Sequence, residues 1–176
     1  MIDDIKQAEA LFNQNVPPGF SFKTQVNKWG VATSWVKLTR LGQLLPAARS
    51  IKQLGGRLHT ISAYQRVEGK PTEIHEIAYH FDLDGSALTL TVFLAEGQRD
   101  IPSLTPVFHN ADWNEREFME LYDLNAVGHP NPTRLFIDEN IDAAVLQKFI
   151  PFSDMVNAAS TKALWEKIMQ QRGEKQ

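Results

Sequence analysis

The sequence predicts an α+β fold in two layers, a mixed sheet of about five strands with helices over one face. Strand-type segments follow one another directly, two of them within 20–38 and three within 57–95. Over this part of the chain, helical patterns occur only before each group, at 2–14 and 41–51, so the order is α-β-β-α-β-β-β. A doubly wound fold would need strict alternation of strands and helices, which this order lacks.

The two helices are predicted from apolar side chains at helical spacing. The first has an apolar stripe made by Ile5, Ala8, Leu11 and Phe12. The second pattern is made by Leu41, Leu44, Leu45, Ala48 and Ile51, and Gly55-Gly56 marks its end. Pro46 lies inside this second pattern, although a proline is tolerated best in the first turn of a helix. The second helix therefore either contains an unfavourable proline or begins later than its apolar pattern.

The five strands are predicted from alternation, β-branched content and turn residues. They are expected at 20–26, 31–38, 57–67, 73–83 and 87–95. The short connection between the first two predicts a hairpin. Gly69-Lys70-Pro71 and Asp84-Gly85 separate the last three, and the second of these is a strong turn signal. One side of the last strand is formed by Leu88, Leu90, Val92 and Leu94.

The composition excludes several classes of function. A net charge of -3 over 176 residues offers no broadly basic face for nucleic acid. The chain has no cysteine, which excludes disulfides, thiol nucleophiles and cysteine-ligated metal sites within it. No apolar run approaches the roughly 20 residues that span a bilayer, so we expect no direct membrane insertion. Residues 1–15 lack the apolar core of a signal peptide, and we expect a cytoplasmic location.

The stretch 101–137 combines Trp, Arg, His and carboxylates with apolar side chains, a density that is unusual for a connector. It opens with a Pro-Ser turn and lacks strand-type alternation. Asp112 is predicted to cap a short helix, with Glu115 as its capping-box partner three residues later. Gly128-His129-Pro130 then predicts a fixed corner, because Gly permits positive φ and Pro holds the preceding residue extended. Arg134 follows this corner closely, so we expect its side chain to extend from a rigid backbone.

Several side chains of this stretch allow two interpretations. Glu115 and Glu117 could form an acid–base pair, but carboxylates in a first turn are usually solvated partners of the helix dipole, which we favour. His129 could ligate a metal, yet no second His or carboxylate stands at ligand spacing, so we favour a corner histidine bound to backbone. Arg116 or Arg134 is expected to pair with a carboxylate, in this chain or in a partner.

A known signature has the same four segments in the same order: Pro102-Ser103-Leu104, Ala111-Asp112-Trp113, Glu115-Arg116-Glu117 and Gly128-His129-Pro130. In this respect the chain resembles the 30 kDa subunit of respiratory complex I, the bacterial NADH:quinone oxidoreductase. The same domain occurs in energy-converting membrane-bound nickel–iron hydrogenases and in formate hydrogenlyase. In this family a glycine usually follows the aromatic residue at the end of the helix, where this chain has Asp123.

The resemblance implies a non-catalytic subunit that carries no cofactor or metal. Such a subunit docks on the large subunit of its complex, which is the quinone-site subunit in complex I and the nickel–iron subunit in hydrogenases. An iron–sulfur subunit is a further expected neighbour, and the assembly is peripheral on the cytoplasmic side of the membrane. The residues expected at the partner interface are Trp113, Glu115, Arg116, Glu117, Gly128, His129, Pro130 and Arg134.

The signature and the strand pattern together predict one domain over 1–138. A helical C-terminal extension is expected over 139–176, with helices at 141–149 and 154–171.

Two other functions remain open at this point. A small stand-alone acid–base hydrolase would need Glu115, Glu117 and His129 to converge on a pocket. A generic binding module that recruits a peptide to a sheet edge would need a long uncovered edge strand.

Overall fold

The computed structural model describes residues 2–66 and 74–138. The elements in chain order are α1 (Ile2–Asn15), β1 (Ser21–Val26), β2 (Ala32–Lys37), a 3-10 turn (Leu41–Gln43), α2 (Leu44–Gln53), β3 (Arg57–Arg66), β4 (Ile74–Leu83), β5 (Ser86–Leu94), β6 (Asp100–Pro102), α3 (Ala111–Tyr122) and β7 (Asn125–Val127). The two helices and five strands predicted for the first part of the chain are all confirmed.

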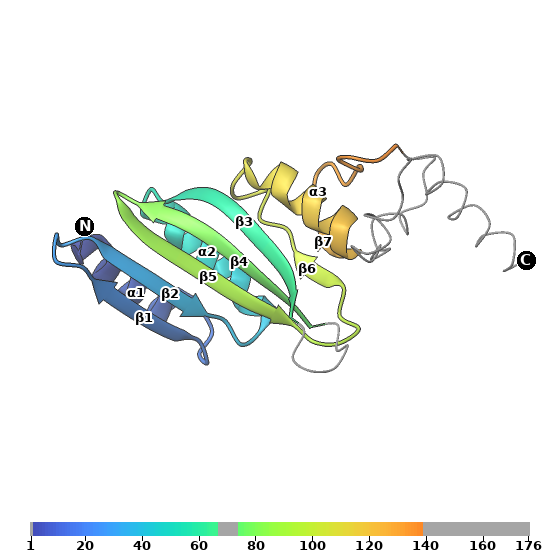
Figure 1. Ribbon diagram of the computed structural model, residues 1–176. Coiled ribbons are helices and arrows are strands. Elements are labelled where there is room, and N and C mark those ends of the chain that lie inside the picture. The colour runs from blue at the N-terminus through green and yellow to red at the C-terminus, as the bar shows by residue number, and fades with distance from the viewer. Residues whose placement is uncertain (1, 67–73, 139–176) are drawn as a thin grey trace, which may run out of the picture. The chain divides into compact units, whose positions relative to one another are not determined.

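Five strands form one mixed sheet in the order β1-β2-β5-β4-β3 (Figure 1). β1 and β2 form the predicted antiparallel hairpin, and β3, β4 and β5 pair in antiparallel fashion one after another. β2 and β5 are parallel, which makes the sheet mixed as predicted. The two edge strands are β1 and the ten-residue β3.

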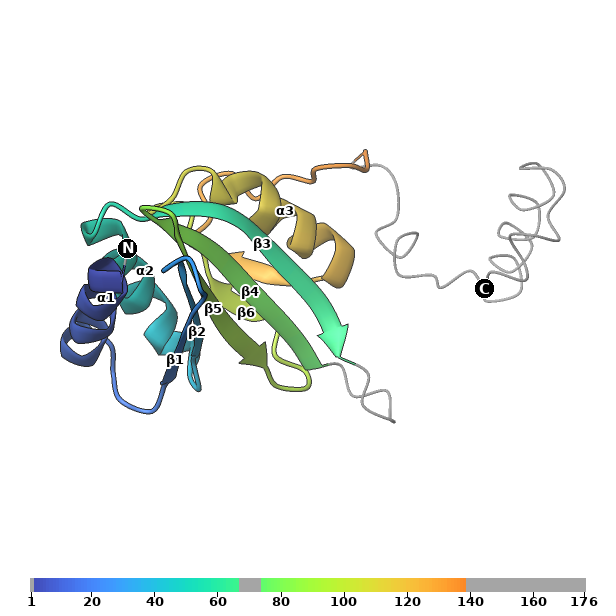
Figure 2. The same cartoon turned by 60° about the vertical axis from the view of Figure 1, so that its left-hand side comes forward.

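The strand register separates a core face of the sheet from an outer face. The core-facing row across all five strands consists of Phe22, Val36, Leu90, Tyr79 and Ile61, of which the last four are buried. The outer row beside it consists of Lys23, Trp35, Thr89, His80 and Thr60, which are all exposed or half-buried. Figure 2 shows α1 and α2 on one side of the sheet, and Phe118 brings α3 into the same core. The predicted two-layer arrangement, with helices over one face, is confirmed.

The start of α2 follows from Pro46. The α-helix begins at Leu44, so Pro46 lies in its first turn, where its missing amide proton costs little. The later start that the sequence left open is therefore the observed one. Gln43 orders the junction before it, because its side-chain oxygen accepts hydrogen bonds from the amides of Thr39 and Arg40 at 2.9 and 3.0 Å.

Two short strands lie in the stretch that shows no strand-type alternation. β6 and β7 pair in parallel and flank α3 in the chain, so the three elements form a strand–helix–strand unit. The buried side chains that fix this unit in the core are Ile101, Leu104, Phe118, Leu124 and Ala126. A strand of three residues is too short for a period of two to be recognised, which explains why the sequence did not indicate it.

Among the predicted turns, Asp84-Gly85 is confirmed, with φ of 46° and 83° at its two residues. The predicted turn Gly69-Lys70-Pro71 and the predicted helices at 141–149 and 154–171 lie outside the described residues. Of the helices in the described ranges, none has the length and apolar character needed to cross a membrane.

Candidate functional site

α3 begins one residue before its predicted cap. The N-cap position is Asn110, whose side chain makes no capping hydrogen bond, and Asp112 lies inside the first turn. The predicted capping box of Asp112 and Glu115 is wrong, because the Glu115 carboxylate is bonded to a different segment. Asp112 instead faces Arg116 and His129.

Glu115 is fully buried, with 0% of its surface exposed. Its carboxylate accepts hydrogen bonds from the Ser103 hydroxyl and the Leu104 amide, both at 2.5 Å, and from the Thr105 hydroxyl at 2.8 Å. A buried carboxylate is strongly destabilising unless such donors replace its water. The prediction of a solvated Glu115 is therefore wrong, and this side chain instead ties α3 to the turn at 103–105.

Tyr79, in the middle of β4, is close enough to Glu115 to be affected by its charge. Burial and, to a lesser degree, the negative charge of Glu115 raise the pKa of the Tyr79 phenol well above its usual value. The hydroxyl has no hydrogen-bond partner among the described residues. Tyr79 therefore stays neutral at physiological pH and lines the core as an aromatic ring.

His129 is bound to backbone, as predicted for the corner. Its Nδ1 accepts a hydrogen bond from the Asn131 amide at 3.0 Å, which assigns the ring proton to Nε2. Nε2 lies 3.3 Å from Asp112 Oδ1 and 3.7 Å from Glu115 Oε2, so two carboxylates lie near it that the sequence spacing did not indicate. No group of three or more His, Cys, Asp or Glu side chains in the described ranges could hold a metal ion.

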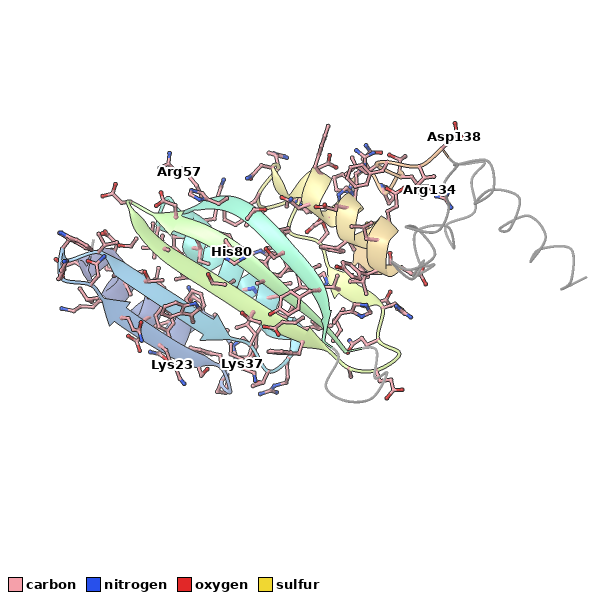
Figure 3. The ribbon with its side chains drawn as sticks, viewed as in Figure 1. Lys23, Lys37, Arg57, His80, Arg134 and Asp138 are labelled. Carbon is pink, nitrogen blue, oxygen red and sulfur yellow. The ribbon has the colours of Figure 1, made fainter. Side chains whose placement is uncertain are left out.

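Arg116 pairs with a carboxylate, as predicted, since its Nη1 lies 3.7 Å from Asp112 Oδ2. Its shorter contacts are with backbone, because Nε donates to the Thr133 carbonyl at 2.8 Å and Nη2 to the Arg134 carbonyl at 2.6 Å. The planar guanidinium is suited to hold two acceptors at once. Arg134 in turn donates from Nη1 to the Asp138 carbonyl at 3.1 Å, and Figure 3 shows these two residues beyond α3.

Glu120 binds the next residues of the same segment through their amides. Its carboxylate accepts hydrogen bonds from Leu135, Phe136 and Ile137 at 2.9, 2.8 and 2.8 Å. Burial acts to raise the pKa of Glu120, but the three amides and the nearby Arg134 outweigh it and lower the pKa below its ordinary value. We call Arg116, Glu120 and the backbone of 133–137 the clamp, since two helix side chains hold an otherwise irregular segment.

The remaining predicted interface residues lie at the surface. Trp113 is 67% exposed, and Phe136 in the clamp is 63% exposed. Gly128 and Pro130 are also exposed, and Gly128 has the positive φ of 85° that the corner requires. Large aromatic side chains on a rigid backbone are typical anchors of protein–protein contacts. Two members of the predicted set, Glu115 and His129, have side chains that lie inside the protein rather than at its surface.

Glu115, Glu117 and His129 do not converge on an open pocket. The side chains of Glu115 and His129 are completely buried, whereas Glu117 lines a separate cavity between α3 and β3. General acid–base catalysis requires both groups to reach the same substrate. The geometry therefore gives no support to the hydrolase interpretation.

Asp123 ends α3 in the left-handed conformation, with φ of 53°. Glycine adopts this conformation without the Cβ clash that other residues suffer. We expect Asp123→Gly to increase the free energy of unfolding by about 0.5–1 kcal/mol, measured by urea denaturation. Asp123→Ala removes the same carboxylate but keeps Cβ, so a gain in that variant would contradict the explanation.

Comparison with known sequences agrees with the signature. The profile of the family described as respiratory-chain NADH dehydrogenase, 30 Kd subunit, matches residues 35–158. The C/D subunit of the NADH-quinone oxidoreductase of Erwinia tasmaniensis is 30% identical over 138 residues, which is 74% of this chain and 23% of that protein. The protein of the same name from Pectobacterium atrosepticum is 30% identical over 141 residues. The chain thus spans about a quarter of the length of the curated relatives that it matches.

Comparison with solved structures agrees with the fold. The trypsin-resistant fragment of Nqo5 has a TM-score of 0.55 at 19% identity and covers 73% of this chain and 98% of its own. A chain of the membrane-bound sulfane sulfur reductase, an archaeal respiratory membrane complex, has a TM-score of 0.66 at 11% identity. The match covers 86% of this chain and 89% of the reductase chain. These likenesses concern the fold, while the profile match spans well over half of the chain. The chain belongs to the family of the 30 kDa subunit of respiratory-chain NADH dehydrogenase.

Proposed function

We propose that this chain is a non-catalytic structural subunit of an NADH:quinone oxidoreductase or of a related membrane-bound complex of the nickel–iron hydrogenase type. It contributes no cofactor in this proposal. It docks on the large subunit of the complex through the region around α3, and an iron–sulfur subunit is a further neighbour. The complex places it peripherally on the cytoplasmic side of the membrane.

The clamp is the observation that carries this proposal. Arg116 and Glu120 bind the irregular backbone of 133–137 through its carbonyls and amides at 2.6 to 2.9 Å. A segment that is already ordered loses little further conformational entropy when a partner binds it. The exposed aromatic rings of Trp113 and Phe136 belong to the same region and are available as anchors.

The lengths of the relatives support a large partner. The matched region is about a quarter of proteins whose names carry the double designation C/D, so there it is part of a longer polypeptide. We infer that the partner of this chain corresponds to the remainder of such a polypeptide.

Affinity purification of the tagged chain from solubilised native membranes tests the proposal directly. The large subunit is expected to co-purify, and mass spectrometry of that subunit identifies the complex as an oxidoreductase or a hydrogenase type. Recovery of the chain with no large subunit would contradict the proposal.

Trp113→Ala is expected to reduce recovery of the large subunit at least tenfold, because truncating a central aromatic anchor typically costs about 2 kcal/mol or more. Trp29→Ala is the matched control, since Trp29 is 72% exposed and lies in the turn between β1 and β2. That variant should recover as much large subunit as the wild type. Equal recovery with both variants would show that Trp113 does not anchor the partner.

A further inference from the structure

A cavity of about 290 Å³ lies between α3 and the edge strand β3. Its walls include Ile61 and Ala63 from the strand and Asn114, Glu117, Phe118 and Tyr122 from the helix. Pockets that bind drug-sized ligands measure about 300–1,000 Å³, so this cavity is at their lower limit. It suits a single long side chain better than a nucleotide or a quinone.

Two polar side chains of the cavity wall, Asn114 and Glu117, have no partner among the residues that the structure describes. Asn114 and Glu117 lie one turn apart on α3 and are both half-buried. Neither side chain forms a hydrogen bond or an ion pair with any other residue that the structure describes. An unpaired carboxylate in the wall of a cavity is available to bind a cation from outside the described residues.

The other acidic side chains of α3 are already engaged. Asp112 faces Arg116 and His129, Glu115 binds the turn at 103–105, and Glu120 belongs to the clamp. Glu117 is thus the carboxylate of α3 that remains for a ligand from outside the described residues. It lines the cavity together with the apolar residues Ile61 and Phe118, which are otherwise buried in the core.

We propose that this cavity receives an arginine side chain of the partner polypeptide, with its guanidinium on Glu117 and its aliphatic stem against Ile61 and Phe118. The inference rests on the proposed function, since the arginine comes from the docked subunit. A guanidinium can bind a carboxylate through two parallel N–H groups and still donate to the Asn114 side chain. A lysine ammonium is a point donor and cannot match this planar arrangement.

Binding of a small arginine derivative tests the cavity directly in the full-length chain. N-acetyl-arginine amide is titrated against isotopically labelled protein, and the NMR signals of the 61–63 amides and the Asn114 side-chain amide are followed. It should bind at least tenfold more tightly than N-acetyl-citrulline amide, which has the same shape without the charge. Glu117→Gln should abolish this preference, whereas Glu96→Gln, a change at an exposed carboxylate after β5, should leave it unchanged.

Several outcomes of this titration would overturn the inference. The first is an absence of saturable binding of the arginine derivative. The second is that the citrulline derivative or N-acetyl-lysine amide binds as tightly as the arginine derivative. The third is that Glu117→Gln keeps the preference for the arginine over the citrulline derivative. Thermal unfolding of the Glu117→Gln variant shows whether it folds as the wild type does.

Purification from membranes separates this inference from the proposed function. Glu117→Lys should reduce recovery of the large subunit at least tenfold, because it places two cations against each other. Normal recovery with Glu117→Lys overturns the arginine site alone. Failure of the wild-type chain to recover any large subunit overturns the proposed function, while the titration still decides whether the cavity binds a guanidinium.

Discussion

Replacing Glu115 by alanine is expected to destabilise the protein by about 3–5 kcal/mol, the largest effect of any substitution considered on α3. The carboxylate is the common acceptor for the hydroxyls of Ser103 and Thr105 and for the Leu104 amide. Its removal leaves these buried donors without an acceptor and also creates a cavity in the core. Urea denaturation monitored by tryptophan fluorescence measures the change.

Two matched variants show whether this loss of stability is specific to the Glu115 carboxylate or would follow any substitution of a glutamate in α3. Glu117→Ala lies two residues away and removes a carboxylate that has no partner among the described residues, so it should change stability by less than about 0.5 kcal/mol. Glu115→Gln keeps one acceptor oxygen and most of the volume, and it should fall between the wild type and Glu115→Ala. Similar stability of Glu115→Ala and Glu117→Ala would show that the buried contacts are not stabilising.

Glu120→Ala is expected to open the clamp and to destabilise the protein by about 2–3 kcal/mol. The amides of Leu135, Phe136 and Ile137 lose their shared acceptor, so their hydrogen exchange should accelerate more than that of the sheet. Hydrogen-exchange mass spectrometry resolves this difference. Uniform acceleration over the whole chain would indicate global unfolding and would contradict a local role.

The pH dependence of the clamp follows from the same carboxylate. The folded-state pKa of Glu120 is lower than its ordinary value of 4.5, because the amide hydrogen bonds and Arg134 outweigh the effect of burial. The stabilisation is therefore fully present above pH 4.5 and is lost as the pH falls through the lower folded-state pKa. The stability difference between wild type and Glu120→Gln should be largest near neutral pH and shrink in this acidic range. A difference that is constant with pH would exclude the charged carboxylate as its cause.

Much of the fold could be predicted because its signals are local. The alternating apolar residues predicted which face of β5 lies in the core, and these residues are Leu88, Leu90, Val92 and Leu94. The pair Asp84-Gly85 predicted the turn before this strand. Pro46 restricted where α2 could begin. Each of these features depends on neighbours within a few residues, so the sequence alone carries the information.

The site could be located from the sequence, but the roles of its carboxylates could not. Glu115 has the spacing of a capping-box residue, yet its partners lie 10 to 12 residues upstream. Glu120 binds amides 15 to 17 residues downstream, and no local pattern marks such a contact. Both roles depend on how the segments before and after α3 fold back on the helix, which only tertiary structure reveals. His129 was easier to predict, because the corner itself supplies its bond to the Asn131 amide.

The hydrogen bonds that the two clamp side chains make to the segment 133–137 all go to main-chain atoms, and this separates the shape of the segment from its chemistry. The carbonyls of Thr133 and Arg134 and the amides of Leu135, Phe136 and Ile137 would be present whatever side chains those positions carried, proline apart. Part of the backbone path is thus fixed from the helix, at Arg116 and Glu120. Substitutions at 133–137 can therefore change which surface is recognised while the scaffold beneath it keeps its form.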